Sequence, residues 1–298
     1  MKFYFSCFFL CGIFLACISY QSLQGYGQNT RSQLFALESG MPFYQVGDSL
    51  FSLVEDSLVW ADEFNTGSMI DTGNWTYETG YVRNNEIQYY TVARAENCRI
   101  EDGFLIITGR EDTPPYPTAT GAAHITSASI TTKGKHAWQH GYFEIRAKVP
   151  TGQGPWAAFW GKGDNQNRGV PWPACGEIDI MEYAAQTPVM IQNLIYGSNY
   201  NDYQQQTLKI NRDFSDNYHI YSLKWTAKQM TFAIDHIVTH TVNLDDLPFP
   251  EIFKQPFFIL LNLALGTADG STIGGRLDKN CLPAEFRVDY IRVYQNKK

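Results

Sequence analysis

The sequence predicts an all-β protein, a sandwich or jelly roll, and three observations lead to this expectation. Residues 142–149 (YFEIRAKV) and residues 219–225 (HIYSLKW) alternate regularly, and such alternation turns one face of a strand toward a core. Gly, Pro, Asn and Asp separate the segments, as in tight turns. No long stretch has the periodicity of an amphipathic helix. Many short strands joined by turns are typical of a single sandwich or jelly-roll domain.

Each expected element follows from its own pattern. In residues 142–149, Phe143, Ile145 and Ala147 fall on one face and should be buried. Residues 219–225 place a histidine, a tyrosine, a leucine and a tryptophan on one face. Residues 247–255 (LPFPEIFKQ) can form a short helix. Further short strands are expected in three segments, residues 103–109, 230–242 and 286–294.

The composition indicates a globular domain and excludes some partners. The chain has 298 residues, of which 44% are hydrophobic and 18% are charged, so it can bury a sizeable core. The net charge of -7 argues against a nucleic-acid partner. No phosphate-binding or dinucleotide-binding glycine motif and no zinc-type cysteine spacing is present. We expect a monomer that needs no cofactor.

The first residues are expected to direct export. Residues 1–16 combine Lys2 with an apolar run that is short for a bilayer span, which is typical of a signal peptide. The "FLAC" that ends at Cys17 resembles a bacterial lipoprotein cleavage box, with Cys17 as the lipidated residue; ordinary cleavage near residues 26–28 is the alternative. Residues 17–45 are expected to form a flexible tether, and residues 46–298 the folded domain. The expected location is the bacterial outer membrane, at the surface or on the periplasmic side, or else secretion.

Only three cysteines lie outside the export segment, which excludes a disulfide-rich scaffold. A Cys98–Cys281 bridge stays open from the sequence. Cys175 is interpreted as a small buried hydrophobic residue rather than a nucleophile.

Residues 176–183 (GEIDIMEY) form an apolar strand that nevertheless carries three carboxylates. Acidic side chains are rarely buried without a partner. Glu177 and Asp179 share a face, but Glu182 falls out of the two-residue rhythm. A β-bulge at residues 180–181 would return Glu182 to the face of the other two. The pattern therefore predicts a bulged strand with three acids in one cleft.

The spacing of the acids suggests their chemistry. With the bulge, Glu177 and Glu182 are about 13 Å apart between Cα atoms, and inward-pointing side chains leave roughly 5 Å between the carboxyls. Retaining glycosidases hold their two carboxylates about 5–5.5 Å apart. Like charges this close raise one pKa, which keeps a general acid protonated. The alternatives are a solvated face of an edge strand and calcium binding by the three acids.

Five sequence blocks resemble glycoside hydrolase family 16, in its bulged E-x-D-x-x-E branch of laminarinases and endo-β-1,3(4)-glucanases. The likeness runs from Val59 to Tyr294, and the blocks occur in order at residues 60–65, 84–91, 142–160, 171–183 and 288–294. The resemblance implies a jelly-roll sandwich of two curved antiparallel sheets with a substrate cleft on the concave face. It also implies that Glu177 is the nucleophile and Glu182 the acid/base, and that Asp179 adjusts the ionisation of the nucleophile.

The resemblance further implies residues that bind the polysaccharide. Indole rings suit the apolar faces of sugars, although core packing is the alternative for each tryptophan, turn capping for the asparagine, and a core position for the histidine. The resemblance points to Asn85, Trp156, Trp160 and Trp172. Tyr196, which stands where laminarinases have a histidine, and His219, from the strand face that it shares with Tyr221 and Trp225, are added to the predicted cleft residues. Many family members also bind one structural calcium ion on the convex side, and the matching positions here are Glu63, Gly103 and Asp289.

The expected function is endo-hydrolysis of β-1,3- or mixed β-1,3/1,4-glucan. A galactan hydrolase of the agarase or carrageenase type and a glucan-binding lectin are the alternatives, and the two glutamates argue against the lectin. Two departures from laminarinases favour cleavage of mixed-linkage glucan at least as well as of laminarin. Tyr196 stands about where laminarinases have a histidine, and the loop of residues 267–275 lacks the usual tryptophan.

Overall fold

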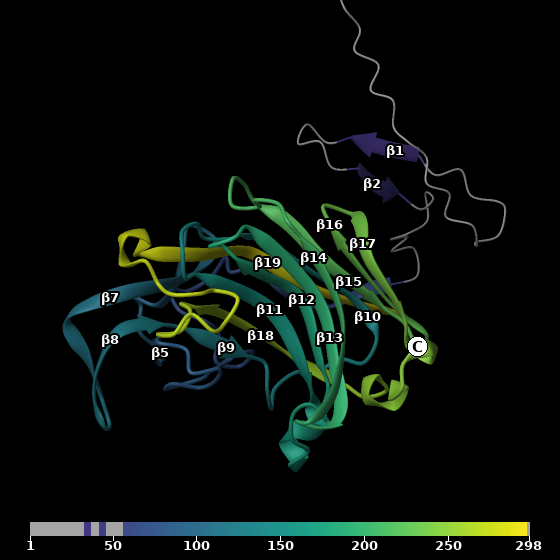
Figure 1. Cartoon of the computed structure of the whole chain (residues 1–298), viewed down its shortest axis with the longest axis horizontal. Coiled ribbons are helices and arrows are strands. Elements are labelled where there is room, and N and C mark those ends of the chain that lie inside the picture. Colours follow the sequence, from purple (N-terminus) through teal and green to yellow (C-terminus); the bar gives the residue numbers. More distant parts are fainter. Residues whose placement is uncertain (1–32, 37–41, 46–55, 297–298) are drawn as a thin grey trace, which may run out of the picture. The chain divides into compact units, whose positions relative to one another are not determined.

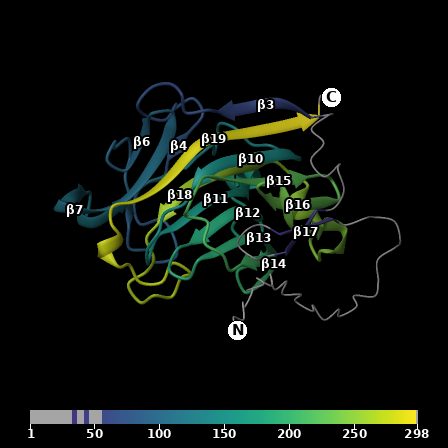
Figure 2. The same ribbon diagram turned by 90° about the horizontal axis from the view of Figure 1, so that it is seen from above.

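The computed structural model describes residues 33–36, 42–45 and 56–296, and its main body consists of two curved β-sheets (Figure 1). The predicted all-β jelly-roll class is therefore confirmed. Every strand pair in the two sheets is antiparallel except β5 with β8, which is parallel. Figure 2 shows the ribbon from above, with β3 beside β19.

The larger sheet has ten strands in the order β17-β16-β15-β10-β19-β7-β8-β5, with β3 paired to β19 and β6 to β7. Its strands are β3 (Asp56–Asp62), β5 (Tyr89–Tyr90), β6 (Cys98–Glu101), β7 (Phe104–Thr118), β8 (Gly121–Ser127), β10 (Gly141–Lys148), β15 (His219–Trp225), β16 (Gln229–Ile234), β17 (Ile237–Asn243) and β19 (Ala284–Asn296).

The smaller sheet has seven strands in the order β14-β13-β12-β11-β18-β9-β4. Its strands are β4 (Thr76–Tyr77), β9 (Ser129–Thr131), β11 (Trp156–Gly163), β12 (Glu177–Ala184), β13 (Val189–Asn199), β14 (Asp202–Ile210) and β18 (Phe257–Ala264). The described residues also contain four 3₁₀-helices, η1 (Asp164–Arg168), η2 (Leu244–Asp246), η3 (Pro250–Phe253) and η4 (Lys279–Cys281).

The core contains apolar side chains from both sheets. Phe143, Ile145 and Ala147 of β10 are buried on one face, as their alternation predicts. Phe159 of β11 and Met181 of β12 belong to the same cluster from the opposite sheet. Burial of a large apolar side chain contributes about 1.5–3 kcal/mol to stability. Because the apolar residues of the smaller sheet face this core, the outer face of that sheet carries polar and aromatic side chains.

Local sequence explains the connections. The two-residue turn between β16 and β17 holds Asp235 and His236 at φ values of 50° and 63°. Positive φ at both central residues is the backbone of a type I′ turn, which suits the twist of a hairpin. The expected short helix in residues 247–255 is found as η3, with Pro250 at its first position. In the parts of the chain that the structure describes, we find no helix long and apolar enough to cross a membrane.

The structure describes only part of the N-terminal segments for which the sequence made predictions. Residues 1–16 and Cys17 lie outside the described residues. Within the predicted tether of residues 17–45, strands β1 (Gln33–Ala36) and β2 (Pro42–Gln45) form an antiparallel pair, so this part of the segment has regular structure that the prediction did not include.

The three cysteines of the domain are free thiols. Cys98 and Cys175 are buried and Cys281 is half-buried. The Cys98–Cys281 bridge that the sequence left open is therefore not formed, and the burial of Cys175 agrees with its interpretation as a small hydrophobic residue.

Candidate active site

The predicted bulge lies where the three acids require it. Along β12, Asp179 pairs with Asn193 and Glu182 with Ile191 of β13, so two residues of β12 oppose one residue of β13. On the other side, Phe159 of β11 pairs with Met181 and the next residue pairs with Asp179. The extra residue shifts the alternation by one position, which returns Glu182 to the face that carries Glu177 and Asp179.

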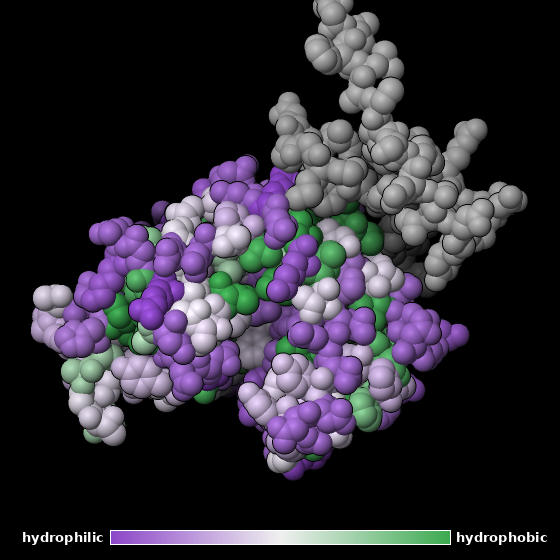
Figure 3. Space-filling model, in the orientation of Figure 1, coloured by the Kyte–Doolittle hydropathy of each residue, from purple (hydrophilic) through white to green (hydrophobic). Residues whose placement is uncertain are grey.

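The acids face a cleft of about 600 Å³ on the outer, concave face of the smaller sheet. Its floor crosses β18, β11, β12, β13 and β14, and four spacings between five strands make it roughly 19 Å wide. Figure 3 shows a recess in this face bordered largely by hydrophilic residues. Measured across the strands, the floor is long enough for several sugar units.

Glu177 lies next to positive charge. The Nζ of Lys162 is 4.0 Å from its Oε2, because Lys162 pairs with Glu177 across β11 and β12. Burial raises the pKa of Glu177, and the charges of Lys162 and Arg83 together with a hydrogen bond from Trp172 act against that rise. These contacts favour the carboxylate form that a nucleophile needs.

Glu182 has the opposite surroundings. Its pKa is raised to about 8, first by burial and then by the negative charge of Glu177. Trp156 donates its Nε1–H to Oε1 of Glu182 at 3.1 Å, and no cation appears among the groups that act on this carboxyl. Glu182 therefore holds a proton near neutral pH, which is the state of a general acid.

Asp179 lies between the two glutamates and is 2% exposed. Burial, then the charges of Glu182 and Glu177, raise its pKa well above the usual range, while a hydrogen bond from Asn193 lowers it. The Thr207 hydroxyl donates to Oδ1 of Asn193 at 2.7 Å, which leaves the amide N–H₂ of Asn193 for Asp179. Thr207 thus fixes the orientation of the amide that contacts the central acid.

Residues beside the three acids support the floor of the cleft. Arg83 forms an ion pair with Glu78, and its guanidinium lies 5.1 Å from the ring centroid of Trp160. Trp160 in turn donates its Nε1–H to Asn262 at 2.7 Å. Nearby, Glu86 accepts hydrogen bonds from Asn84, Gln88 and Tyr90, and its charge contributes to the raised pKa of Glu182.

Comparison with known proteins identifies the family. The model of glycosyl hydrolases family 16 matches residues 62–292, which include the whole cleft. The chain belongs to glycosyl hydrolases family 16. It is 36% identical over 251 residues to a β-glucanase of Rhodothermus marinus, an alignment that covers 80% of this chain and 85% of that protein.

Solved structures of the family have the same fold. The laminarinase catalytic domain of Thermotoga maritima aligns with a TM-score of 0.71 and 32% identity, over 82% of this chain and all of that one. A variant of LamA from Z. galactanivorans, solved with laminaritriose and laminaritetraose, aligns with a TM-score of 0.71 and 31% identity, over 80% of this chain and 99% of that one.

The three tryptophans expected from the family resemblance line the cleft. Trp156 and Trp160 lie on β11 and point to the same side of the strand. Trp172 precedes β12 and lies against Tyr200 and Tyr203 of the β13–β14 hairpin. Contact of these rings with a sugar stays a prediction.

Tyr196 is not a cleft residue, contrary to the sequence prediction. Its ring is 1% exposed and packs edge-on against Phe253 in the core between the sheets. Its neighbour Ile195 lines the cleft instead. Because Ile191 pairs with Glu182, the cleft face of β13 holds residues 191, 193 and 195, and an even-numbered residue faces the core.

The prediction for His219 is also wrong, whereas sugar contact by Asn85 stays a prediction. His219 lies on β15 of the larger sheet, away from the cleft, where its Nδ1 is 2.7 Å from Asp235 and its Nε2 3.2 Å from Asp216. These carboxylates raise its pKa, chiefly the hydrogen-bonded Asp235. Asn85 is exposed in a turn with a φ of 53°, and its neighbours Asn84 and Glu86 line the cleft in its place.

Several cleft residues were missed by sequence reasoning. Lys162 shares its face of β11 with Trp156 and Trp160, so a count of alternate residues from the predicted tryptophans would have found it. The same count along β14 joins Tyr203 to three polar residues, Gln205, Thr207 and Lys209. Arg83 lies in a loop without periodicity and gave no such signal.

The two carboxylates predicted to bind calcium, those of Glu63 and Asp289, have other partners. The Glu63 carboxylate accepts two hydrogen bonds from Arg292, at 2.7 and 2.9 Å, and Asp289 pairs with Arg146. Neither carboxylate is free for a cation in this arrangement, so the side chains do not fit a calcium ion. Among the described residues, no group of three or more His, Cys, Asp or Glu side chains is placed to hold a metal. Calcium binding through backbone carbonyls stays a prediction.

Proposed function

We propose that this family 16 enzyme is an endo-acting β-glucanase that cleaves β-1,3- or mixed β-1,3/1,4-glucan with retention of configuration. The observation that carries the mechanism is the contrast between Glu177, next to Lys162, and Glu182, whose pKa is about 8. The choice of a glucan is supported by the relatives named β-glucanase and laminarinase.

In the first step, the Glu177 carboxylate attacks the anomeric carbon while Glu182 gives its proton to the glycosidic oxygen. The bond to the leaving chain breaks and a glycosyl ester of Glu177 forms. In the second step, the Glu182 carboxylate takes a proton from water, and the water oxygen attacks the anomeric carbon and displaces Glu177. Both acids return to their starting states. Asp179, held by Asn193, is proposed to adjust the charge next to Glu177.

The stereochemical test is NMR of early products. Double displacement gives the β-anomer first, and mutarotation produces the α-anomer only later. Early α-anomer would contradict the two-step mechanism.

The substrate test is incubation with laminarin, lichenan, barley glucan, agarose and carrageenan, followed by sizing of the products. Of the three cleft cations, Arg83 pairs with Glu78 and Lys162 faces Glu177, which leaves Lys209 alone for a sulfated galactan. We expect shortened chains from the glucans only. Products from agarose or carrageenan alone would favour the galactan hydrolase.

The linkage preference now rests on one feature. Because Tyr196 is buried, only the tryptophan-free loop of residues 267–275 still supports cleavage of mixed-linkage glucan at least as well as laminarin, and this loop contributes Ile273 to the cleft. Single contacts change specificity by about 1–3 kcal/mol. The measurement is kcat/KM on barley glucan and laminarin, and a strong preference for laminarin would contradict the prediction.

We also propose export through residues 1–16 and lipid attachment at Cys17. The support is the sequence of the segment alone. Mass spectrometry of the N-terminal peptide from the membrane fraction should show a lipid-modified Cys17, and Cys17→Ser should move the protein to the soluble fraction. An unmodified N-terminus near residues 26–28 would indicate ordinary cleavage.

A further inference from the structure

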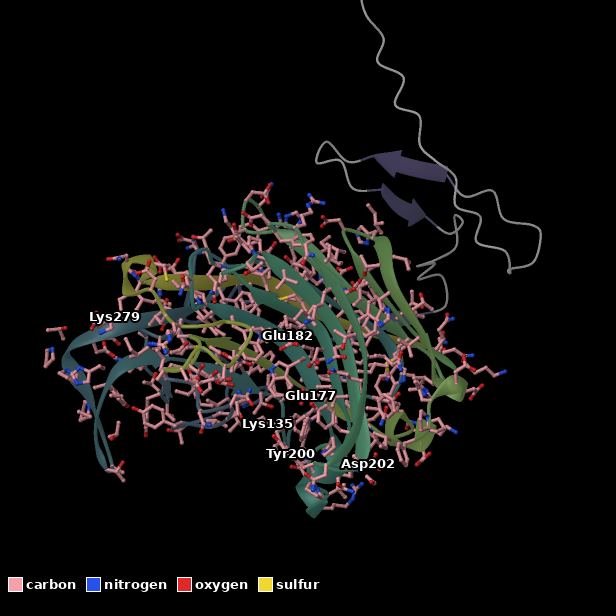
Figure 4. The ribbon with its side chains drawn as sticks, viewed as in Figure 1. Lys135, Glu177, Glu182, Tyr200, Asp202 and Lys279 are labelled. Atoms are coloured by element: carbon pink, nitrogen blue, oxygen red, sulfur yellow. The ribbon has the colours of Figure 1, made fainter. Side chains whose placement is uncertain are left out.

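Three aromatic rings gather at one end of the cleft. The ring centroid of Trp172 is 5.6 Å from that of Tyr200 and 5.4 Å from that of Tyr203, and the two tyrosines are 6.5 Å apart. All three interplanar angles lie between 48° and 57°. The rings are tilted rather than stacked face to face, so they do not cover one another's faces. In Figure 4, Tyr200 lies beyond Glu177 on the side away from Glu182.

The two tyrosines are unusually open to solvent. Tyr200 is 71% exposed, more than any other large hydrophobic residue that the structure describes, and Tyr203 is 43% exposed. Large rings that stay in water forgo the stabilisation that burial would give. Clustered exposure of this kind next to a cleft marks a surface for a ligand.

The rings continue into polar groups that suit a sugar. Tyr203, Gln205, Thr207 and Lys209 are alternate residues of β14, and all four line the cleft. A sugar ring presents an apolar C–H face and a rim of hydroxyl groups, so it needs an aromatic surface and hydrogen-bonding side chains together. The end of the cleft at β14 supplies both.

The hairpin that carries the tyrosines is a fixed turn. The Ser198 hydroxyl donates to Asp202 at 3.2 Å, and the backbone N–H of Asn201 donates to the side chain of Asn199 at 3.0 Å. The strands approach so closely at Gly197 that a Cβ there would lie 2.4 Å from the Asp202 carbonyl oxygen. A site on an ordered turn loses little entropy when it binds.

We propose that Tyr200 and Tyr203, on the far side of Trp172 from Glu177, form an outer binding site for a glucosyl unit of the chain being cleaved. The inference rests on the proposed glucanase function and adds a specificity for chain length. Because Trp172 contacts Glu177 and the two tyrosines contact Trp172 without contacting either glutamate, the site strengthens binding of long chains and leaves the chemistry on short ones unchanged.

The test compares Tyr200→Ala, Tyr203→Ala and the double variant with the wild type on laminari-oligosaccharides of two to eight units and on laminarin. Tyr81→Ala is the matched control, because Tyr81 is 61% exposed and does not line the cleft. In the double variant we expect kcat/KM to fall roughly tenfold on the longest substrates, mainly through KM, and to stay unchanged on the shortest cleaved oligosaccharide. The control should match the wild type at every length. Thermal unfolding of each variant reports whether it is folded.

Three outcomes would count against this site. A double variant equal to the wild type at every length shows that the rings bind no sugar. An equal loss at every length, with kcat reduced, shows that the rings support Glu177 rather than an outer site. If the double variant melts well below the wild type, the single variant Tyr200→Ala is measured instead. Wild-type kinetics of Tyr200→Ala at all chain lengths would then overturn the proposal. If the wild type cleaves none of these glucans, the proposed function itself fails, and this result is distinct from the other three.

Discussion

The two ends of strand β12 carry the same side chain in opposite surroundings. At one end, Glu177 lies 4.0 Å from Lys162, and the positive charge of Arg83 also acts to lower its pKa. At the other, Glu182 has the N–H of Trp156 and no cation among the groups that act on it, and its pKa is about 8. Neighbours on other strands and loops thus give two identical carboxyl groups different tendencies to ionise. Figure 4 shows both along the same strand.

The largest effect should follow removal of the nucleophile. Glu177→Ala removes the group that forms the covalent intermediate, so we expect hydrolysis of glucan to fall by more than about 10⁴-fold while the protein stays folded. Initial rates on laminarin and a thermal melt measure this. Activity close to wild type would show that the two roles are assigned to the wrong ends of the strand.

Loss of the acid at the other end should be smaller and should depend on the substrate. Glu182→Ala should lose about 10²–10⁴-fold on glucan, but far less on aryl glycosides whose leaving group needs little protonation. Azide should then speed up the variant and give a β-glycosyl azide. Product analysis by NMR decides this, and an α-azide or an equal loss on both substrates would contradict the assignment.

The positive charge that distinguishes the Glu177 end can be removed alone. Lys162→Met keeps much of the apolar stem over Trp160 but deletes the charge that lowers the pKa of Glu177. We expect the acidic limb of the kcat/KM–pH profile to move to higher pH, with a loss of roughly tenfold at pH 5 and a smaller one at pH 7. Lys209→Met is the control, because Lys209 lines the cleft without acting on Glu177. An unmoved limb would show that Lys162 does not tune this acid.

The smallest effect is on stability. The pKa of Glu182 is raised from 4.5 to about 8 in the folded state, so between these values the folded protein keeps a proton that the unfolded chain releases. The free energy of unfolding therefore falls as pH rises through this window. Glu182→Gln cannot ionise, so it should melt at least several degrees above the wild type at pH 9. At pH 4 the variant and the wild type should melt at the same temperature. Equal melting temperatures at both pH values would contradict the raised pKa.

The sequence predicted the catalytic strand well because the relevant pattern is local. Three acids and one break in a two-residue rhythm fall within six residues, so the bulge at residues 180–181 follows from the geometry of a single strand. The core face of β10 was predicted for the same reason. Strand alternation needs no knowledge of the rest of the chain.

Features that depend on partners from elsewhere were harder to predict. Tyr196 was placed in the cleft, but the face of β13 is set by its register on β12 beyond the bulge. His219 was placed in the cleft, although its strand belongs to the other sheet. Arg83 reaches the floor from a loop, and its guanidinium lies over Trp160, a residue distant in the sequence whose proximity only the folded chain reveals.

The bulge also gives the catalytic strand an unusual freedom in chain length. In a regular strand, removal of one residue turns every later side chain to the opposite face. Here, deletion of Ile180 leaves Glu177, Asp179 and the second glutamate on alternate residues, all toward the cleft, with Ile178 and Met181 toward the core. The loss is one core side chain, 3% exposed, worth about 2–5 kcal/mol of stability. A catalytic strand can thus become one residue shorter without turning any catalytic group away from its substrate, and residual activity of the deletion variant on laminarin would measure how far that freedom extends.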